Sequence, residues 1–255
     1  MRAVSAHDVA PCFPPQDDGL AATVCAQDAL FDQQFPRYVR ERSSQYWTPV
    51  AVAARAATIF RERGARRILD VGCGPGKFCL IAGRSQPELE MHGVEQRSRL
   101  VRLGSGLARR LNARNVRLSA GDVTTMPWDV YDGFYFFNPF SENIMRPSDQ
   151  FDHKVPLSTL RFGTELLLVE SLLEQARVGT VLVTYFGLGG PIPASYELVA
   201  DECAGADRLR TWIQGPSRRP SSTWIETVDS VISVSRSDMR CALASLIKDG
   251  TSVEA

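Results

Sequence analysis

A turn with three glycines, in the sequence ILDVGCGPGKF, is the stretch whose residue types are best suited to binding chemistry. Gly72, Gly74 and Gly76 let the backbone turn tightly and approach a bound molecule with no Cβ in the way. A helix that begins at this turn would direct its free N–H groups toward that molecule. The dinucleotide fingerprint requires a glycine at position 77, where the chain has Lys77, and Asp70 is a poor neighbour for a pyrophosphate. The turn therefore predicts a ligand site that suits a cationic ligand better than a dinucleotide.

Two acidic residues follow, each at the end of a further predicted strand. Glu95 ends EMHGVE, about 20 residues past the glycines, where a carboxylate can accept both hydroxyls of a ribose. Asp122 ends VRLSAGD and can accept a hydrogen bond from an exocyclic amine such as that of adenine, with Val123 and Met126 as apolar walls. A solvated strand-end carboxylate is the alternative interpretation of Glu95, and a turn-capping aspartate that of Asp122.

A fourth candidate is the sequence FFNPFSEN, in which an apolar run ends at Asn138, Pro139 and Phe140. The Asn-Pro pair can simply end a buried strand, or it can hold a side-chain amide at the mouth of a cleft. The long loop that follows, residues 141–158, is expected to lie over the same crevice. Its polar side chains are candidates for substrate contact or for a base: Glu142, Asp149, Asp152, His153 and Lys154.

These candidates require a sheet that places several strand ends along one edge. Strands are predicted at 66–72, 90–95, 116–122, 132–138 and 180–186, and helices at 76–85, 98–112 and 159–176. Their alternation predicts an α/β fold with a doubly wound, mainly parallel, seven-stranded sheet. The stretches 196–202 and 208–214 are predicted to add an antiparallel hairpin at one edge, although 208–214 could instead pair with 223–229.

The N-terminal part is predicted to supply helices outside the sheet. Apolar residues recur at helical spacing over 26–43, and a second helix is expected with Thr48 as its cap, Pro49 as its first residue and Gly64 at its end. Three parts follow from this outline: an N-terminal arm and helix at 1–44, a ligand-binding domain at 45–214, and a C-terminal extension at 215–255 with a small helix at 237–248.

Composition excludes several classes of function. With 29 basic and 29 acidic residues the formal net charge is zero, which argues against broad binding to nucleic acid or to an anionic membrane. The chain has no Cys-x-x-Cys pair and three histidines, so no metal site is expected. No stretch approaches the roughly 18 apolar residues of a membrane span, and no N-terminal signal is apparent. A cytoplasmic protein without a membrane partner is predicted, and its oligomeric state is left open.

Together, the four stretches resemble the motifs of class I (Rossmann-like) S-adenosylmethionine-dependent methyltransferases, over about residues 45–214. LDVGCGPGKF is similar to their first motif, GVEQ to the second, GDV to the third and FYFFNPF to the fourth. The resemblance implies S-adenosyl-L-methionine as the cofactor. It implies that the methionine part is held by the glycine turn, the ribose by Glu95 and the adenine by Asp122. The cofactor-binding residues so implied are Asp70, Gly72, Cys73, Gly74, Gly76, Glu95, Gln96, Asp122, Val123 and Asn138.

The fourth motif bears on the methyl acceptor. Methyltransferases that act on amide or aromatic amine nitrogens often carry Asn/Asp-Pro-Pro-aromatic there, and Asn138-Pro139-Phe140 is similar but one residue shorter. Dot1-type histone-lysine methyltransferases carry Asn-Asn-Phe there and Gly-Val-Glu in the second motif, which is also similar. YWTP at 46–49 resembles a segment that closes over the cofactor in amino-methyltransferases, although a plain helix start explains it equally well.

These resemblances imply N-methylation of a small molecule or a protein side chain. Asn138 would orient the acceptor, and Pro139 and Phe140 would complete the catalytic set. The alternative is a catalytically silent S-adenosylmethionine-binding module that acts as a sensor or partner subunit, and a nicotinamide dehydrogenase is a more distant possibility.

Overall fold

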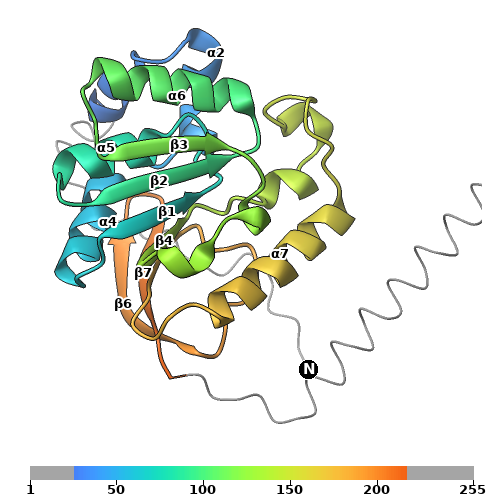
Figure 1. Cartoon of the computed structure of the whole chain (residues 1–255). Coiled ribbons are helices and arrows are strands. Elements are labelled where there is room, and N and C mark those ends of the chain that lie inside the picture. The colour runs from blue at the N-terminus through green and yellow to red at the C-terminus, as the bar shows by residue number, and fades with distance from the viewer. Residues whose placement is uncertain (1–25, 217–255) are drawn as a thin grey trace, which may run out of the picture. The chain divides into compact units, whose positions relative to one another are not determined.

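The computed structural model describes residues 26–216, which form a seven-stranded sheet covered by helices on both faces (Figure 1). The strands are β1 Arg67–Val71, β2 Glu90–Glu95, β3 Val116–Ala120, β4 Gly133–Phe136, β5 Val181–Tyr185, β6 Tyr196–Ala204 and β7 Asp207–Gln214. Their order is β3-β2-β1-β4-β5-β7-β6, parallel from β3 to β5 and antiparallel where β7 meets β5 and β6. The predicted doubly wound sheet and its edge hairpin are both confirmed.

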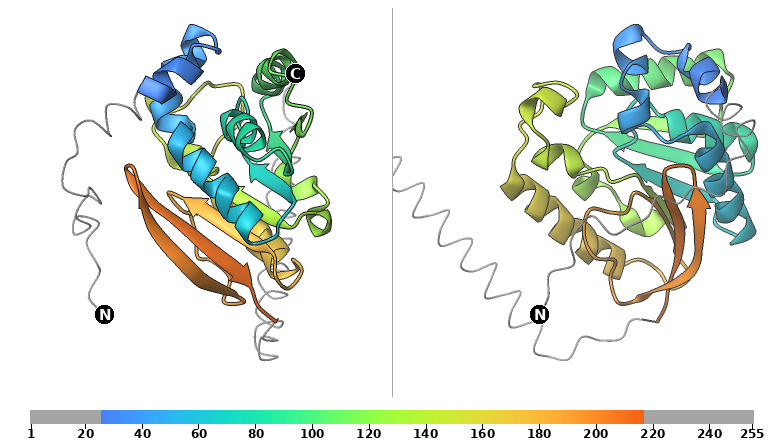
Figure 2. Two further views of the ribbon diagram at one scale, coloured as in Figure 1. Left: turned by 90° about the vertical axis from the view of Figure 1, so that its left-hand side faces the viewer. Right: turned by 180° about the vertical axis from the view of Figure 1, so that it is seen from behind.

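The helices divide between the two faces of the sheet (Figure 2). They are α2 Arg37–Arg40, α3 Ser43–Tyr46, α4 Val50–Glu62, α5 Lys77–Ser85, α6 Ser98–Arg110 and α7 Thr159–Glu174, with short 3₁₀ turns η1 Val123–Thr125, η2 Trp128–Val130, η3 Ser141–Ile144 and η4 Pro147–Asp149. Side chains of α4, α5 and α6 share one apolar core, and those of α7, η1 and η2 share another on the opposite face. The predicted helices at 76–85, 98–112 and 159–176 are therefore confirmed.

Alternation along the central strands fills both cores. In β1, Ile68 belongs to the core under α4 and α5, whereas Leu69 belongs to the core under α7. In β4, Tyr135 lies on the first face and Phe134 on the second. Burial on both faces explains why these strands appear as continuous apolar runs in the sequence. Asp70 shares the α5 face with Ile68, and its carboxyl group is consequently buried there.

The single helix predicted at 26–43 is wrong. Residues 26–32 are helical, and the chain then turns before α2 begins after Pro36. Proline has no N–H to donate and disfavours helical backbone at the preceding residue, so it ends the helical pattern. The apolar periodicity across the break comes from separate short helices that pack on the same core.

The predicted cap of α4 is also wrong. Pro49 is the N-cap and the helix begins at Val50, whose N–H donates to Asp28 Oδ1 at 3.0 Å. The Thr48 hydroxyl instead pairs with the Tyr135 hydroxyl at 2.9 Å in the core. Gly64, with a φ of 76°, follows the last turn as predicted.

The leucines of α7 are only partly covered by the rest of the described chain. Val169 and Leu173 are buried, whereas Leu160 and Leu167 are 82% and 65% exposed. No helix between residues 26 and 216 has the length and hydropathy needed to cross a membrane. The N-terminal arm, most of the C-terminal extension with its helix at 237–248, and the alternative strand at 223–229 lie outside the described residues, so the three-part division stays a prediction.

Candidate active site

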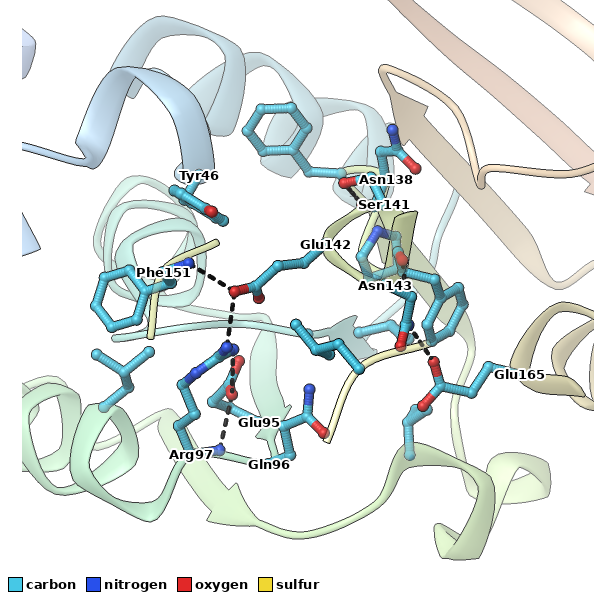
Figure 3. Close-up of a pocket in the computed structure, with 18 of the residues that line it drawn as sticks. Tyr46, Glu95, Gln96, Arg97, Asn138, Ser141, Glu142, Asn143, Phe151 and Glu165 are labelled. Carbon is cyan, nitrogen blue, oxygen red and sulfur yellow. Dashed lines mark hydrogen bonds and ion pairs between the residues drawn. The ribbon is translucent and has the colours of Figure 1, made fainter. Parts of the chain in front are cut away.

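A cavity of about 400 Å³ lies at the carboxyl ends of the parallel strands (Figure 3). Its lining comes from residues 44–47, the ends of β1 to β3, the segment 137–157 after β4, and Phe186 after β5, together with Leu100 of α6 and Arg161 and Glu165 of α7. β1 and β4 are neighbours, and the sheet's connections run in opposite directions from this pair. Such a switch point is where open α/β sheets bind ligands.

Glu95 forms a fixed carboxylate on the cavity wall. Its side chain is buried, Oε1 accepts from the Arg97 N–H at 2.7 Å, and Oε2 accepts from the Gly74 N–H at 3.2 Å. Burial raises the pKa of Glu95, and the N–H groups of Arg97 and Gly74 oppose that rise by stabilising the anion. Each carboxylate oxygen can accept more than one hydrogen bond, so Glu95 retains capacity for hydroxyl groups of a ligand.

The glycine turn requires glycine at all three positions for two reasons. Gly72, Gly74 and Gly76 have φ of 73°, 54° and 75°, in the left-handed region. A Cβ at Gly72 would lie 2.8 Å from Pro139, and a Cβ at Gly74 would overlap the ring of Trp47. Of the three glycines, Gly72 lines the cavity, whereas Trp47 covers Gly74.

The remaining residues predicted for this part of the site, Cys73 and Asp70, are buried behind the cavity wall and do not line it. Asp70 accepts a hydrogen bond from Cys79 Sγ at 3.4 Å. Burial raises the pKa of Asp70 to about 7, and the nearby Glu95 adds to the rise. A positive charge close to Asp70 would favour its ionised form. Direct contact of Asp70, Cys73, Gly74 and Gly76 with a cofactor stays a prediction.

Asp122 and Val123 line the cavity beyond β3. Asp122 caps η1, because its Oδ1 accepts from the Thr124 N–H at 2.9 Å and from the Thr124 hydroxyl at 2.8 Å. Val123 is buried with its side chain in the α7 core. The turn-capping interpretation of Asp122 thus describes this structure, and its contact with an adenine amine stays a prediction.

Asn138 occupies a strained position at the end of β4. Its φ is 39°, and its backbone N–H donates to the carbonyl of Gly187 at 3.0 Å. Its Oδ1 atom is buried, and no donor within residues 26–216 bonds to it. A Cβ at Gly189 would lie 3.0 Å from this oxygen. Left-handed backbone in a residue other than glycine is typical of functional sites, where surrounding contacts impose it.

Several aromatic residues line the cavity together with Asn138, and the catalytic roles of Pro139 and Phe140 stay a prediction. Pro139 packs on Gly72, and Phe140 is buried in the α7 core, although both contribute to the cavity wall. The exposed ring is Phe186, which is 43% exposed, has a φ of 57°, and lies 5.4 Å from the ring of Phe137. Phe186 could not be recognised in the sequence, because nothing in TYFGLGG separates it from a strand-ending aromatic.

Arg97 was not predicted, yet it is the central cation of the site. Its Nη2 contacts Glu142 Oε1 at 2.8 Å, and its Nε contacts Asp152 Oδ1 at 3.1 Å. Burial lowers the pKa of Arg97, but Glu142, Asp152 and Glu95 outweigh burial and leave it raised. The available signal was a basic residue two positions after the predicted ribose ligand, facing a loop rich in acids.

A second polar network on the α7 side was also missed. Glu165 accepts from Asn143 Nδ2 at 2.8 Å and from Arg161 Nε at 2.8 Å. Arg161 also donates to Gln96 Oε1 at 2.7 Å, which ties the predicted cofactor residue Gln96 to α7. The i,i+4 spacing of Arg161 and Glu165 was the available signal. Within residues 26–216 no group of His, Cys, Asp or Glu side chains is placed to hold a metal ion.

Comparisons with known proteins find similarity in the part of the chain that forms the cavity. A family model described as a methyltransferase domain matches residues 62–151. A search of curated proteins finds no match.

Solved structures with a similar fold include an RNA methyltransferase from Salinibacter ruber in complex with S-adenosyl-L-homocysteine, at 18% identity over 68% of this chain and 97% of that chain, with a TM-score of 0.48. A putative caffeoyl-CoA O-methyltransferase from Staphylococcus aureus is 12% identical over 76% of this chain and 100% of that one, with a TM-score of 0.45. The putative methyltransferase yhhF from Escherichia coli is 15% identical over 64% of this chain and 85% of that one, with a TM-score of 0.45.

The matched segment contains β1 to β4 with the glycine turn, Glu95, Asp122 and Asn138. The domain match and the four sequence motifs therefore agree. Residues 62–151 are thus similar to a methyltransferase domain, and they hold the residues predicted to bind S-adenosylmethionine.

Proposed function

We propose that this protein transfers the methyl group of S-adenosylmethionine to a nitrogen atom of a small molecule or a protein side chain. The observation that carries the proposal is Asn138, an amide at the end of β4 that lines the cavity beside Gly72. Its Oδ1 is buried against Gly189 and has no donor within the described residues, so a rotation of the side chain toward the cavity would let an acceptor N–H supply the missing donor. A flip of the amide would exchange its oxygen and nitrogen, so the group can adapt to the acceptor.

The residues around the cavity fit the cofactor. Glu95 has remaining acceptor capacity for the two ribose hydroxyls, and Gly72 has no Cβ to block a close approach. Asp122 and Val123 would meet the adenine at the far end of the cavity. The bound cofactor supplies an electrophilic methyl group on a sulfonium, and the protein's task is to hold an acceptor atom in line with it.

Aromatic side chains support this task. Phe137 and Phe186 line the acceptor side, and Tyr46 and Trp47 line the side formed by residues 44–47. Rings at these positions exclude water, and their faces attract cationic groups. Phe186 is exposed and lines the cavity together with Phe140, so we propose that both rings wall the acceptor.

Binding is the first test. Calorimetric titration with S-adenosylhomocysteine should show one site, and Glu95→Ala should weaken it strongly. Glu88→Ala, an exposed acid far from the cavity, is the matched control and should leave the affinity unchanged. An affinity that Glu95→Ala leaves intact would overturn the role of Glu95.

Turnover is the second test. Release of S-adenosylhomocysteine should be followed with a panel of amines and with unmodified cellular protein, and the product atom identified by mass spectrometry. Asn138→Ala should abolish release while it preserves cofactor affinity. Methylation of an oxygen or carbon atom would contradict the proposed acceptor. Tight cofactor binding with no transfer to any acceptor in the panel would instead favour the silent binding module.

A further inference from the structure

We propose that Arg97 is a positioning residue that couples the cofactor side of the cavity to the 141–158 loop, which walls its other side. The inference rests on the proposed function in one respect, that Glu95 is the carboxylate that meets the cofactor. Arg97 itself touches neither cofactor nor acceptor in this proposal. It acts through Glu95, Glu142 and Asp152.

Arg97 contacts the cofactor side of the cavity through its backbone and the loop side through its guanidinium (Figure 3). Its backbone N–H holds Glu95 Oε1 at 2.7 Å, and its guanidinium lies 3.9 Å from the same oxygen. The guanidinium then reaches the loop, where it contacts Glu142 at 2.8 Å near the start and Asp152 at 3.1 Å in the second half. A single side chain thus ties two separate points of the loop that lines the cavity.

The Glu142 carboxylate that contacts Arg97 also binds the backbone of the loop. Glu142 Oε1 also accepts from the Phe151 N–H at 2.7 Å, and the Phe151 ring lies 5.4 Å from the guanidinium carbon. Phe151 in turn contacts the rings of Tyr46 and Trp47, at 5.7 Å and 5.8 Å between centroids. Arg97 therefore organises the loop and, through Phe151, the segment that covers Gly74.

Charge explains why the arrangement depends on Arg97. The side chains of Arg97, Glu95 and Glu142 are 8%, 8% and 11% exposed, so water screens them poorly. Without the guanidinium, Glu142 and Asp152 would lose their shared cation and repel each other and Glu95. The loop would then open, and Glu95 would keep its two backbone hydrogen bonds but lose a nearby positive charge that favours its ionised form.

Coupling of this kind is reciprocal. Suppose that Arg97 holds both the loop and Glu95, so that the closed loop raises the affinity for a ligand at Glu95 by some factor. The bound ligand must then shift the loop equilibrium toward the closed state by the same factor. The closed loop should therefore be harder to open when S-adenosylhomocysteine is bound.

The lysine positions provide a direct measure of loop opening. The chain has three lysines, at positions 77, 154 and 248. Lys77 is buried within α5, whereas Lys154 is exposed on the loop, with its N–H bonded to Asp152. Cleavage by a lysine-specific endoprotease at Lys154 thus reports on the 141–158 loop, and the ratio of rates without and with S-adenosylhomocysteine measures the coupling.

In the wild type, saturating S-adenosylhomocysteine should slow cleavage at Lys154 by about tenfold. Arg97→Met should raise the rate of cleavage at Lys154 in the absence of ligand. The ratio of cleavage rates without and with S-adenosylhomocysteine should fall close to one in this variant. The ligand concentration must be one that calorimetry shows to saturate the variant. Arg102→Met, an exposed arginine on α6, should retain the wild-type rate and ratio. A purely structural role would lower the unfolding temperature of Arg97→Met but leave the protection ratio unchanged.

Two milder variants keep the test decisive if Arg97→Met does not fold. Asp152→Asn and Glu142→Gln each remove one charged contact of Arg97, and each should lower the protection ratio. Wild-type protection in all three variants would overturn the coupling while the cofactor assignment stands. A wild-type protein that does not bind S-adenosylhomocysteine in calorimetry would overturn the proposed function, and the coupling with it.

Discussion

Both carboxylate oxygens of Glu95 accept hydrogen bonds from backbone N–H groups. Ligand binding at this position should therefore depend on the charge of the side chain as well as on its size. Glu95→Gln keeps the volume but turns an NH₂ group toward the N–H of Gly74 or Arg97, where two donors oppose each other. We expect S-adenosylhomocysteine affinity to fall by about tenfold or more, because a buried donor is left unsatisfied. Calorimetry checks this, and an unchanged affinity would show that the carboxylate's charge is not required.

Asp70 should make stability depend on pH. Burial raises its pKa from 3.8 to about 7 in the folded chain, so the folded state holds the proton more tightly than the unfolded state. The associated stability is fully present below about pH 4 and is lost as pH rises through 7, and a shift of this size corresponds to on the order of 4 kcal/mol. Asp70→Asn should flatten this dependence in urea unfolding between pH 5 and 8. A variant with the wild-type slope would contradict a buried, proton-binding Asp70.

The residues that could be predicted from the sequence are those with local signatures. The glycine turn and Glu95 stand at fixed offsets from strand ends, so their positions followed from the alternation of strands and helices. The position of Arg97 two residues after Glu95 was visible in the sequence, but its partners Glu142 and Asp152 lie 45 and 55 positions away and could not be inferred. The place of Phe186 in the cavity wall likewise depends on the pairing of β5 with β4. Contacts between distant segments are what a single sequence without the fold could not supply.

At the scale of elements, the N-terminal helical segment is held by a buried ion pair. Lys77 begins α5, where a cation opposes the helix dipole. Its Nζ lies 2.7 Å from Asp28 Oδ1, 2.9 Å from Asp32 Oδ1 and 3.1 Å from Ser43 Oγ. These partners explain a lysine at an otherwise unfavourable position, and they tie residues 26–32 to the helix that follows the glycine turn.

Lys77→Met should detach this segment. Asp32 would remain buried without its cation, and breaking such a pair costs about 3 kcal/mol or more. The free energy of unfolding in urea should fall accordingly, and trypsin should cut faster after Arg40. Arg37→Ala, which removes an 82% exposed ion-pair partner, serves as the control and should change stability little. Equal stability of Lys77→Met and the wild type would contradict the anchoring role.

Helices and strands could be predicted from the sequence where burial imposes a pattern on the apolar residues. Strands covered on both faces appear as unbroken apolar runs, and all of the predicted strands within residues 26–216 are present. The pattern failed between Asp32 and Pro36, where the helix breaks without a change in the apolar period. It failed again at α7, where Leu160 and Leu167 have apolar side chains that the described residues do not cover. Periodicity records which residues are apolar, but it does not record which neighbour covers them.

At the scale of the whole molecule, a ligand in the cavity would join segments that are remote in sequence. Residues 44–47, the ends of β1 to β3 and the 141–158 loop all line it. S-adenosylhomocysteine at about 100 times its dissociation constant should add about 2.7 kcal/mol to stability, which corresponds to a rise in Tm of about 5–10 °C for a domain of this size. Differential scanning fluorimetry measures this rise. Glu95→Ala should show little of it at the same concentration, and an equal rise in that variant would place the ligand elsewhere.

The strand order has a consequence for how this protein could change its chemistry. The turn, Glu95 and Asp122 all belong to the stretch from β1 to η1, while Asn138 and Phe186 belong to the stretch from β4 to the loop after β5. Each stretch is contiguous in the sequence, and the two meet along a seam that includes the pairing of Ile68–Val71 with Gly133–Phe136 and the contacts of Arg97 with Glu142 and Asp152. A recombination event that preserves this seam would exchange the acceptor half and keep the cofactor half. We expect such an exchange to change the methyl acceptor while the glycine turn and Glu95 stay in place.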